Sequence, residues 1–300
     1  MSFNQKLTEQ PNPATANLDR MSTTELIKVI NQEDQKVAGL IHQEIHAIAA
    51  AVDLISQQLS KGGRLIYIGA GTSGRLGVLD AAECPPTYGV SNEMVQACIA
   101  GGNRAMFSSI EGAEDNMDAG KQDLIKRHID KNDVVCGIAA SGSTPYVIGA
   151  LAYAQSLNIS TIGIAMNPDA KLLDYADYPI VVPVGPEVVM GSTRMKAGTA
   201  QKMILNILST AAMVKLGKVY GNLMVDLQAS NKKLRSRAKR IVMLATHCDT
   251  ETAEKILIKT DYQVKLAIVM LLANVDIKMA KRLLTNGHGH IHQALQSWHD

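Results

Sequence analysis

Aromatic side chains are scarce in this chain of 300 residues, where two phenylalanines, one tryptophan and eight tyrosines amount to 4%. A chain so poor in aromatic rings has few surfaces on which nucleic-acid bases could stack. The formal net charge of +2 also provides no strongly basic surface for a phosphate backbone or an acidic membrane. We therefore expect neither a nucleic-acid partner nor a membrane partner.

Long apolar runs and paired cysteines are missing as well. No apolar stretch reaches the roughly 18 residues without charge that a membrane helix needs, and residues 1–19 are polar and contain two prolines, unlike a secretion signal. The four cysteines are widely spaced with no CxxC pair, at Cys84, Cys98, Cys136 and Cys248. This spacing favours reduced, buried thiols. We expect a cytoplasmic protein.

Apolar residues make up 46% of the chain, which is enough for a large core. Strand-like runs are expected at 64–68, 94–100, 133–139, 160–165 and 178–182, with helical patterns between them at about 73–83, 115–128 and 144–157. The runs are apolar throughout, as in strands whose two faces are both covered by helices. The sequence therefore predicts an α/β fold with a doubly wound, parallel, five-stranded sheet.

Helical segments are expected on both sides of this sheet in the sequence. Residues 1–20 form an arm that we expect to be too polar to pack by itself, and the capping-box spacing of Ser22 and Glu25 begins a helix. Further helices are expected at about 37–59, 194–216, 249–256, 264–272 and 276–284. The predicted domains are an N-terminal arm with helices (1–60), the α/β domain (61–220) and a C-terminal helical bundle (221–300).

Two short loops rich in glycine and hydroxyl groups each follow a strand-like run and precede a helical pattern. The first is GAGTSG at 69–74, and the second is ASGSTP at 140–145. There, free N–H groups, hydroxyls and a helix dipole converge on an anion. Neither loop contains lysine, so the loops predict a phosphorylated small molecule held by hydrogen bonds. The substrate-binding residues expected in them are Gly71, Thr72, Ser73, Ser141, Ser143 and Thr144.

The second loop is the better phosphate site, because its three hydroxyls are denser than the two of the first loop. A dinucleotide site is the alternative for the first loop, whose glycines fit G-x-G-x-x-G. That fingerprint needs an acidic residue near the end of the next strand, and residues 98–102 contain none. A P-loop is excluded because neither loop has a G-K-[ST] sequence. We expect no cofactor.

Carboxylates follow the first loop and the second strand. Glu83 directly precedes Cys84-Pro85-Pro86, through which we expect no helix to continue. The end of a helix disfavours a carboxylate, so Glu83 is a candidate for catalysis. Glu111 and Glu114 lie in the connection that leaves the second strand, where helix capping is an alternative role for Glu114.

A third polar cluster lies where the long helix after the sheet is expected to begin. Its predicted substrate-binding residues are Glu187, Ser192, Arg194 and Lys196. Cations are disfavoured at a helix N-terminus. Either a second anion site or a carboxylate partner would therefore explain them.

Histidines occur in two groups that resemble metal sites only superficially. His42 and His46 are four residues apart, but the glutamate between them is one position late for a zinc-protease motif, so a solvated helix face explains them better. The group of His288, His290 and His292 has no acidic or cysteine ligand nearby. We expect no metal site.

Four segments together resemble the N-acetylmuramic acid 6-phosphate etherase family, whose members contain a sugar isomerase (SIS) domain. They are GAGTSGRLGVLDAAECPPTYG, EGAEDN, ASGSTPYVIGAL and GPEVVMGSTRMKAGTAQKMILN, and the resemblance extends over nearly the whole chain. It implies cleavage of the D-lactyl ether to N-acetylglucosamine 6-phosphate and D-lactate, in the recycling of cell-wall sugar. It also implies a homodimer with the site at the subunit interface, with Glu83 as the catalytic acid and Glu114 as the second catalytic carboxylate.

Other functions stay open at this point. A sugar-phosphate aldose–ketose isomerase would use the same loops with one base. A phosphosugar-sensing regulator similar to the glucokinase regulatory protein would carry two SIS domains, for which this chain is too short. The division of acid and base between Glu83 and Glu114 is also open. Ser73 and Glu83 lie about 15 Å apart along one helix, so if Ser73 held the phosphate, either Glu83 would act from a partner subunit or the helix would bend.

Overall fold

A computed structural model of the chain describes residues 6–229 and 231–299. The chain divides into two compact units. The first consists of Met1–Ala82 and Asn92–Ser209, and the second of Glu83–Ser91 and Thr210–Asp300. Within the described ranges, none of the helices combines the length and the hydropathy that a membrane crossing requires.

The first unit is built on a parallel sheet of five strands in the described residues, in the order β2-β1-β3-β4-β5. The strands are β1 (Leu65–Gly69), β2 (Val95–Ile99), β3 (Val134–Ala139), β4 (Ser160–Ala165) and β5 (Tyr178–Val181). Every residue of β1 and β3 is buried, as the uniformly apolar runs predict. The predicted doubly wound α/β fold is confirmed.

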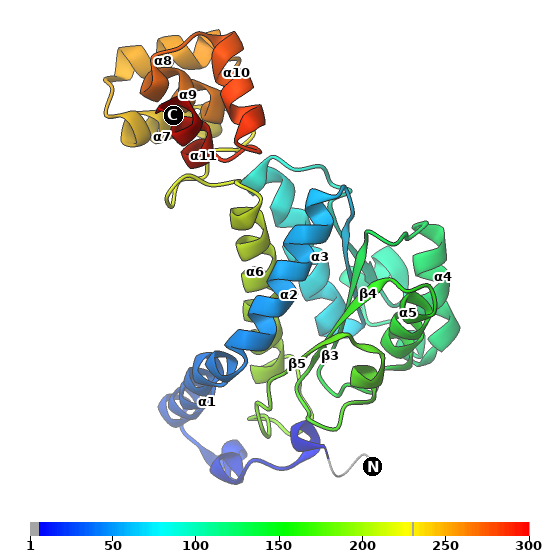
Figure 1. Cartoon of the computed structure of the whole chain (residues 1–300). Helices are drawn as coiled ribbons and strands as arrows, with labels where there is room; N and C mark the ends of the chain where they lie inside the picture. Colours follow the sequence, from blue (N-terminus) through cyan, green and yellow to red (C-terminus); the bar gives the residue numbers. More distant parts are fainter. Residues whose placement is uncertain (1–5, 230, 300) are drawn as a thin grey trace. The chain divides into compact units, whose positions relative to one another are not determined.

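Helices cover both faces of this sheet (Figure 1). One face carries α4 (Met117–Lys126) and α5 (Pro145–Ser156), and the other carries α2 (Ile45–Ser60) and α3 (Gly71–Tyr88). The strand order reverses between β1 and β3, because the chain adds β2 on one side of β1 and β3 on the other. Ligands of doubly wound sheets bind at the carboxyl ends of the strands beside such a reversal.

A buried carboxylate joins β1, α3 and α6 (Lys196–Lys215) inside the first unit. Asp80, which is 5% exposed, accepts hydrogen bonds from Tyr67 Oη at 2.9 Å, Asn206 Nδ2 at 2.7 Å and Ser209 Oγ at 3.0 Å. Burial raises the pKa of Asp80, and the three donors oppose that rise. The carboxylate thus ties two helices to the sheet.

The N-terminal helices differ from the prediction in where they meet. The capping box of Ser22 and Glu25 is present and begins α1 (Thr23–Gln43). This helix runs past residue 37, where a second helix was expected, and the break before α2 falls at Glu44. Val37 and Ile41 are buried on α1, so packing continues the first helix through the predicted boundary.

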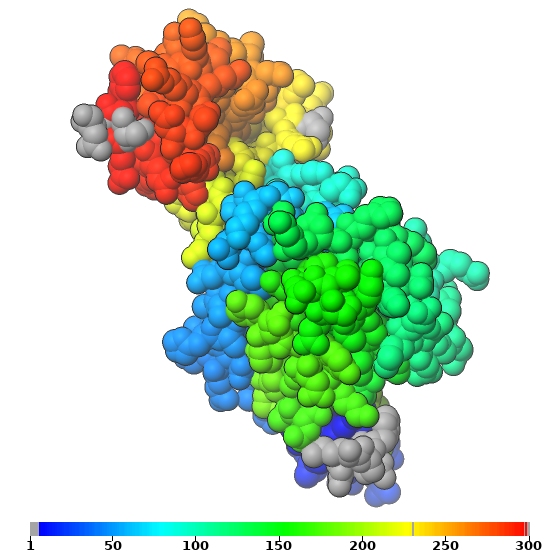
Figure 2. All heavy atoms as spheres, turned by 45° about the vertical axis from the view of Figure 1, so that its right-hand side comes forward, coloured from blue at the N-terminus to red at the C-terminus, as the bar shows by residue number. Residues whose placement is uncertain are grey.

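The arm, which was expected to be too polar to pack by itself, packs against the rest of the first unit. Its described residues form three short 3-10 turns, η2 (Leu7–Glu9), η3 (Pro13–Thr15) and η4 (Leu18–Arg20). Thr8 is fully buried, and Thr15 Oγ1 donates to the carbonyl of Val188 at 2.9 Å. The space-filling view shows the dark-blue arm lying against the green part of the first unit (Figure 2). Hydrogen bonds, rather than apolar side chains, hold it there.

Helix α3 continues through Pro85 and Pro86 to Tyr88, so the predicted stop at Glu83 is also wrong. The fixed backbone angle of proline fits a helix, but proline lacks an N–H donor and its ring crowds the carbonyl four residues earlier. Because both prolines lie in the last turn, only the end of the helix loses hydrogen bonds, and Gly89 N–H still donates to Pro85 O at 2.9 Å. Glu83 is therefore not the last residue of the helix, so an unfavourable position at the helix end no longer supports a catalytic role for it.

The second unit contains a cluster of short helices. They are α7 (Lys232–Thr246), α8 (Thr250–Lys259), α9 (Val264–Ala273), α10 (Ile277–Asn286) and α11 (Ile291–His299). The apolar α9 is almost wholly buried among the others. The three predicted helices are confirmed. Helices α7 and α11 were missed, although Asn231 caps α7 by accepting the Leu234 N–H at 2.9 Å.

We predict that Asp80→Ala lowers the free energy of unfolding by about 2–4 kcal/mol, because buried donors on Tyr67, Asn206 and Ser209 would lose their acceptor. Urea unfolding followed by circular dichroism measures this loss. Asp19→Ala is the control. The Asp19 carboxylate is exposed, and its distance of 4.0 Å from Arg20 Nε is too long for a hydrogen bond. Equal stability of the two variants would contradict the role assigned to Asp80.

Candidate active site

The two hydroxyl-rich loops lie at the carboxyl ends of β1 and β3, on either side of the strand-order reversal. Glycine permits the close packing of the first loop, since a Cβ on Gly74 would lie 2.6 Å from Ile99 Cγ1 and 2.7 Å from Gly69 O. In the second loop, Gly142 has φ +67°, and a Cβ there would lie 2.0 Å from Ala170 Cβ. The glycines therefore serve packing as much as ligand approach.

Ser73 of the first loop is 8% exposed, and its hydroxyl donates to Gln201 Oε1 at 2.9 Å. A serine hydroxyl has one proton, so Ser73 can only accept further hydrogen bonds in this arrangement. Gln201 is 1% exposed, and its Nε2 has no hydrogen-bond partner within the described residues. Ser73 thus offers a ligand only an acceptor, which suits a sugar hydroxyl or amide, while the Thr72 hydroxyl and the backbone N–H groups are the donors of this loop.

The second loop presents its hydroxyls differently. Ser141 Oγ and Ser143 Oγ lie 3.2 Å apart, and the Ser143 N–H donates to Ser141 Oγ at 3.2 Å. Thr144 is the N-cap residue of α5, but its side chain makes no capping hydrogen bond in the described structure. All three residues are partly exposed, so their hydroxyls are accessible to an anion.

A cation that the motifs did not reveal reaches this second loop. Lys6, in the N-terminal arm, donates from Nζ to Ser143 Oγ. The two residues are 137 positions apart in the chain, and no local pattern connects them. A lysine in a polar arm carries no signal by which sequence reasoning could have found it.

A cavity of about 260 Å³ lies beside the first loop in the first unit. Its lining includes Gly71, Arg75, Glu111 and Glu114, from the start of α3 and from the connection after β2. Arg75 donates to the carbonyls of Met106 at 3.2 Å and Ser108 at 3.4 Å, which holds this connection in place. Glu114 is exposed in η6 (Ala113–Asp115), so its carboxylate is accessible from solvent.

Glu83 is exposed on α3, and its segment belongs to the second compact unit, whereas Glu114 belongs to the first. The catalytic roles expected for these two residues stay predictions. Thr72, which follows Gly71, is partly exposed, and its Cγ2 would lie 3.4 Å from a Cβ on Gly198. The first loop is thereby packed against the beginning of α6.

The third cluster is held largely by contacts within the protein. Glu187 is fully buried and accepts the N–H groups of Lys196 at 3.0 Å and Ala197 at 2.9 Å, which caps α6. Burial raises the pKa of Glu187, against the lowering effect of these N–H groups. Ser192 is partly exposed and Arg194 is exposed, so both are accessible to a ligand.

Lys196 pairs with a carboxylate of the protein, which is one of the two alternatives that the sequence left open for the cations at the start of α6. It is 2% exposed, and its Nζ bonds to Glu33 of α1, which is 3% exposed and also contacts Lys36. Burial acts to raise the pKa of Glu33, but the hydrogen bonds from Lys196 and Lys36 outweigh it and leave the pKa below its ordinary value. The pair connects the start of α6 to the N-terminal helix.

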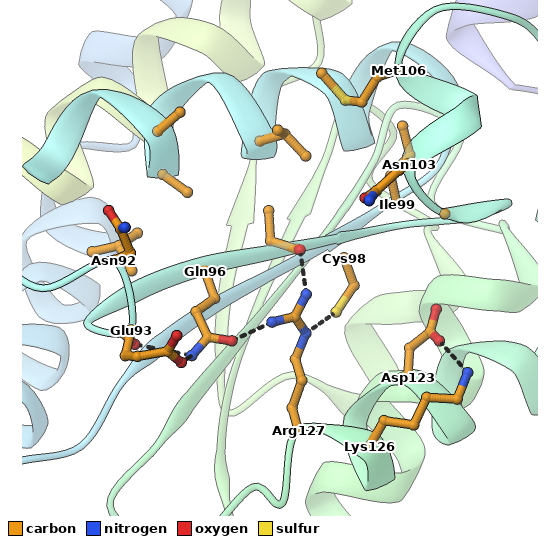
Figure 3. A pocket seen from close by; sticks show the side chains of 16 residues that line it. Asn92, Glu93, Gln96, Cys98, Ile99, Asn103, Met106, Asp123, Lys126 and Arg127 are labelled. Atoms are coloured by element: carbon orange, nitrogen blue, oxygen red, sulfur yellow. Dashed lines mark hydrogen bonds and ion pairs between the residues drawn. The ribbon is translucent and has the colours of Figure 1, made fainter.

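A different cavity, of about 600 Å³, lies along the outer edge of β2 (Figure 3). Arg127 points into it, donates to the carbonyl of Ala97 at 2.8 Å and contacts Gln96 and Cys98. These bonds occupy the guanidinium group and cover an open sheet edge. Neither hydroxyl-rich loop lines this cavity, so the cavity is not part of the candidate site.

Metal ligands do not gather in the part of the chain that the structure describes, where no group of three or more histidine, cysteine or acidic side chains could hold an ion. His42 and His46 are both exposed on α1 and α2, in agreement with the predicted solvated face. The four cysteines are free thiols, three of them buried.

Comparison with known proteins identifies the class as a SIS-domain protein. Residues 112–211 match the SIS domain, residues 47–155 the glucokinase regulatory protein N-terminal SIS domain, and residues 221–267 the C-terminal lid domain of glucokinase regulatory protein. A solved phosphoheptose isomerase from Francisella tularensis is 17% identical with a TM-score of 0.50, over 65% of this chain and 100% of that one. That likeness shows the fold.

Within this class, the chain belongs to the N-acetylmuramic acid 6-phosphate etherase family. It is 54% identical over 291 residues to the etherase of Clostridioides difficile (strain 630), which covers 97% of this chain and 96% of the relative. It is also 54% identical over 294 residues to the etherase of Actinobacillus pleuropneumoniae serotype 7 (strain AP76), over 98% and 97% of the two chains. The resemblance found in the four motifs is confirmed.

We predict that Lys196→Met lowers the free energy of unfolding by about 3–5 kcal/mol, because it leaves the buried Glu33 carboxylate without its main partner. The double variant Glu33→Leu/Lys196→Met should recover most of this loss. Lys28→Met, an exposed position on α1, is the matched control. A single variant as stable as the control would contradict the assignment.

The same pair predicts an acid dependence of stability. The folded pKa of Glu33 lies below its unfolded value of about 4.3, so the stabilisation is complete above that pH and is lost as the pH falls through the folded pKa. Thermal melts of the wild type from neutral to acid pH should show this loss, and the double variant should show less of it.

Proposed function

We propose that this protein cleaves the D-lactyl ether of N-acetylmuramic acid 6-phosphate to N-acetylglucosamine 6-phosphate and D-lactate, as a cytoplasmic step in cell-wall sugar recycling. The observation that carries the proposal is the 54% identity to an etherase over 97% of the chain. The hydroxyl-rich loops at the carboxyl ends of β1 and β3 support a phosphosugar as the ligand.

The phosphate binds to the second loop in this proposal. Ser141, Ser143 and Thr144 are partly exposed there at the N-terminus of α5, where the helix dipole favours an anion. The proton of Ser73 is directed to Gln201, so Ser73 accepts hydrogen bonds from the sugar instead. Gly71 and Thr72 complete the sugar side of the site.

The ether is activated by the sugar's own carbonyl group. In the ring-opened aldehyde, the C1 carbonyl acidifies the C2 proton, and Glu114 removes this proton as the base. The C3–O bond then breaks, and Glu83 donates a proton to the leaving oxygen of D-lactate. Water adds to C3 of the unsaturated aldehyde while Glu83 accepts its proton and Glu114 returns a proton to C2. Each assisted proton transfer contributes about 10²–10⁴-fold to the rate.

The third cluster contributes in two ways. Ser192 and Arg194 are accessible and are assigned to substrate binding. Glu187 and Lys196 are buried and bonded within the protein, which supports a positioning role at the start of α6 for the two residues that were expected to contact substrate. The reaction needs no cofactor and no metal ion.

A second copy of the chain completes the site in this proposal. Ser73 and Glu83 are separated by about 15 Å of helix rise, and both lie on α3. This separation would require a second subunit only if Ser73 held the phosphate, which this proposal assigns to the second loop. The homodimer with the site at the subunit interface is proposed because the resemblance to the etherase family implies it.

Glu83→Gln and Glu114→Gln should each lower kcat for D-lactate release by about 10²–10⁴-fold, because each removes one proton-transfer group. A coupled D-lactate assay on N-acetylmuramic acid 6-phosphate measures the effect. Glu251→Gln, an exposed carboxylate at the start of α8, is the matched control and should keep full activity. Wild-type activity in both variants would remove the catalytic assignment, and a wild type that releases no D-lactate would refute the reaction.

Deuterated water distinguishes elimination from direct displacement at C3. Removal and return of the C2 proton predicts deuterium at C2 of the N-acetylglucosamine 6-phosphate that is formed. Nuclear magnetic resonance or mass spectrometry of the product measures the label. Unlabelled product mixed with the enzyme in deuterated water is the control for exchange after the reaction. Product without label at C2 would exclude the elimination scheme.

A further inference from the structure

The second loop contains no cation, although a phosphate monoester carries about −1.5 to −2 charges near pH 7. Its own donors are hydroxyl and backbone N–H groups, which are neutral. Hydrogen bonds to phosphate from a charged donor are roughly twice as strong as neutral ones. A cation at this loop would therefore strengthen binding and favour phosphorylated over unphosphorylated sugars.

The N-terminal arm brings a cation to this loop. Lys6 Nζ donates to Ser143 Oγ, and Ser141 Oγ lies 3.2 Å from the same oxygen. An ammonium group has three protons, so Lys6 can donate to more than one acceptor at a time. The ammonium and the two hydroxyls therefore share one small region at the carboxyl end of β3.

A second lysine acts on the first at this position. Burial lowers the pKa of Lys6, Glu9 opposes this change, and the positive charge of Lys171 in η7 (Lys171–Tyr175) lowers it further. Lys171 lies beside the second loop, because the next residue, Leu172, donates its N–H to the Gly142 carbonyl at 2.9 Å. A phosphate at this loop would therefore meet two positive charges, Lys6 and Lys171, and the one negative charge of Glu9.

The arm is fixed to the loop by an asparagine just after β4. Asn167, which is 4% exposed, accepts the Leu7 N–H at 2.8 Å and donates to the carbonyl of Ala140 at 2.9 Å. Its Nδ2 also lies 3.3 Å from the Oγ1 of the buried Thr8. The backbone beside Lys6 is therefore held in place before any ligand binds, which lowers the entropy cost of using its side chain.

We propose that Lys6 is a substrate-binding residue that contacts the 6-phosphate together with Ser141 and Ser143. The arm then selects phosphorylated over unphosphorylated sugar. This inference rests on the proposed function, which supplies the phosphorylated sugar. The competing role is structural, in which Lys6 only attaches the arm to Ser143.

The test compares Lys6→Met and Lys6→Arg with the wild type and with the exposed control Lys28→Met. Calorimetry measures binding of N-acetylglucosamine 6-phosphate, N-acetylglucosamine and inorganic phosphate, and the D-lactate assay gives kcat and KM. Lys6→Met should weaken binding of both phosphate ligands and raise KM by about 10- to 100-fold, the range for a hydrogen bond to a charged group. Lys6→Arg should retain most of the affinity, and kcat should change little.

Two results would overturn the proposal. One is equal binding of the phosphate ligands by Lys6→Met and the wild type. The other is an equal loss of affinity for phosphorylated and unphosphorylated sugar, because that pattern means that the arm only shapes the loop. Inorganic phosphate binding requires no turnover, so a wild type without D-lactate release would refute the reaction while the phosphate measurement still decides the role of Lys6. Melting temperatures equal to that of Lys28→Met show that the variants are folded.

Discussion

The parallel pairing of β1 with β3 is the constraint on which the candidate site depends. Because both strands run in the same direction, their carboxyl ends meet at one edge of the sheet, and the loops at 69–74 and 140–145 come side by side. Buried β-branched and aliphatic side chains on both faces hold this register. Two strand-to-helix loops come together at one edge of the sheet only through this pairing.

Contacts from distant parts of the chain then give these two loops different hydrogen-bonding groups. Ser73 donates its hydroxyl proton in a hydrogen bond to Gln201 Oε1 on α6, so Ser73 can only accept from a ligand. Asn167 and the N-terminal arm bring Lys6 to Ser143, which adds a cation to the second loop. Glu187 and the buried pair of Lys196 with Glu33 fix the start of α6 beside them. The two loops therefore have different chemistry despite their similar sequences.

Apolar patterns predicted the strands well, because a fully buried parallel strand leaves an unbroken apolar run. Prolines misled the prediction where a local rule competed with packing. Pro85 and Pro86 do not stop α3, since they cost hydrogen bonds only in its last turn. The polar arm packs because its threonine and asparagine side chains find carbonyl partners that no local pattern reveals. Helix α7 was missed because its basic composition conceals a short buried face of Ala238, Ile241 and Val242.

By itself, the sequence determined the sheet, the two loops, the family and the identity of the candidate carboxylates. Each of these depends on a contiguous motif or on a regular pattern of apolar residues. Only the tertiary structure decided which hydroxyl donates and which accepts, that Lys196 pairs with Glu33 rather than with a ligand, and that Lys6 reaches the second loop. These outcomes depend on contacts between residues as many as 163 positions apart, and separation of that size leaves no local signature.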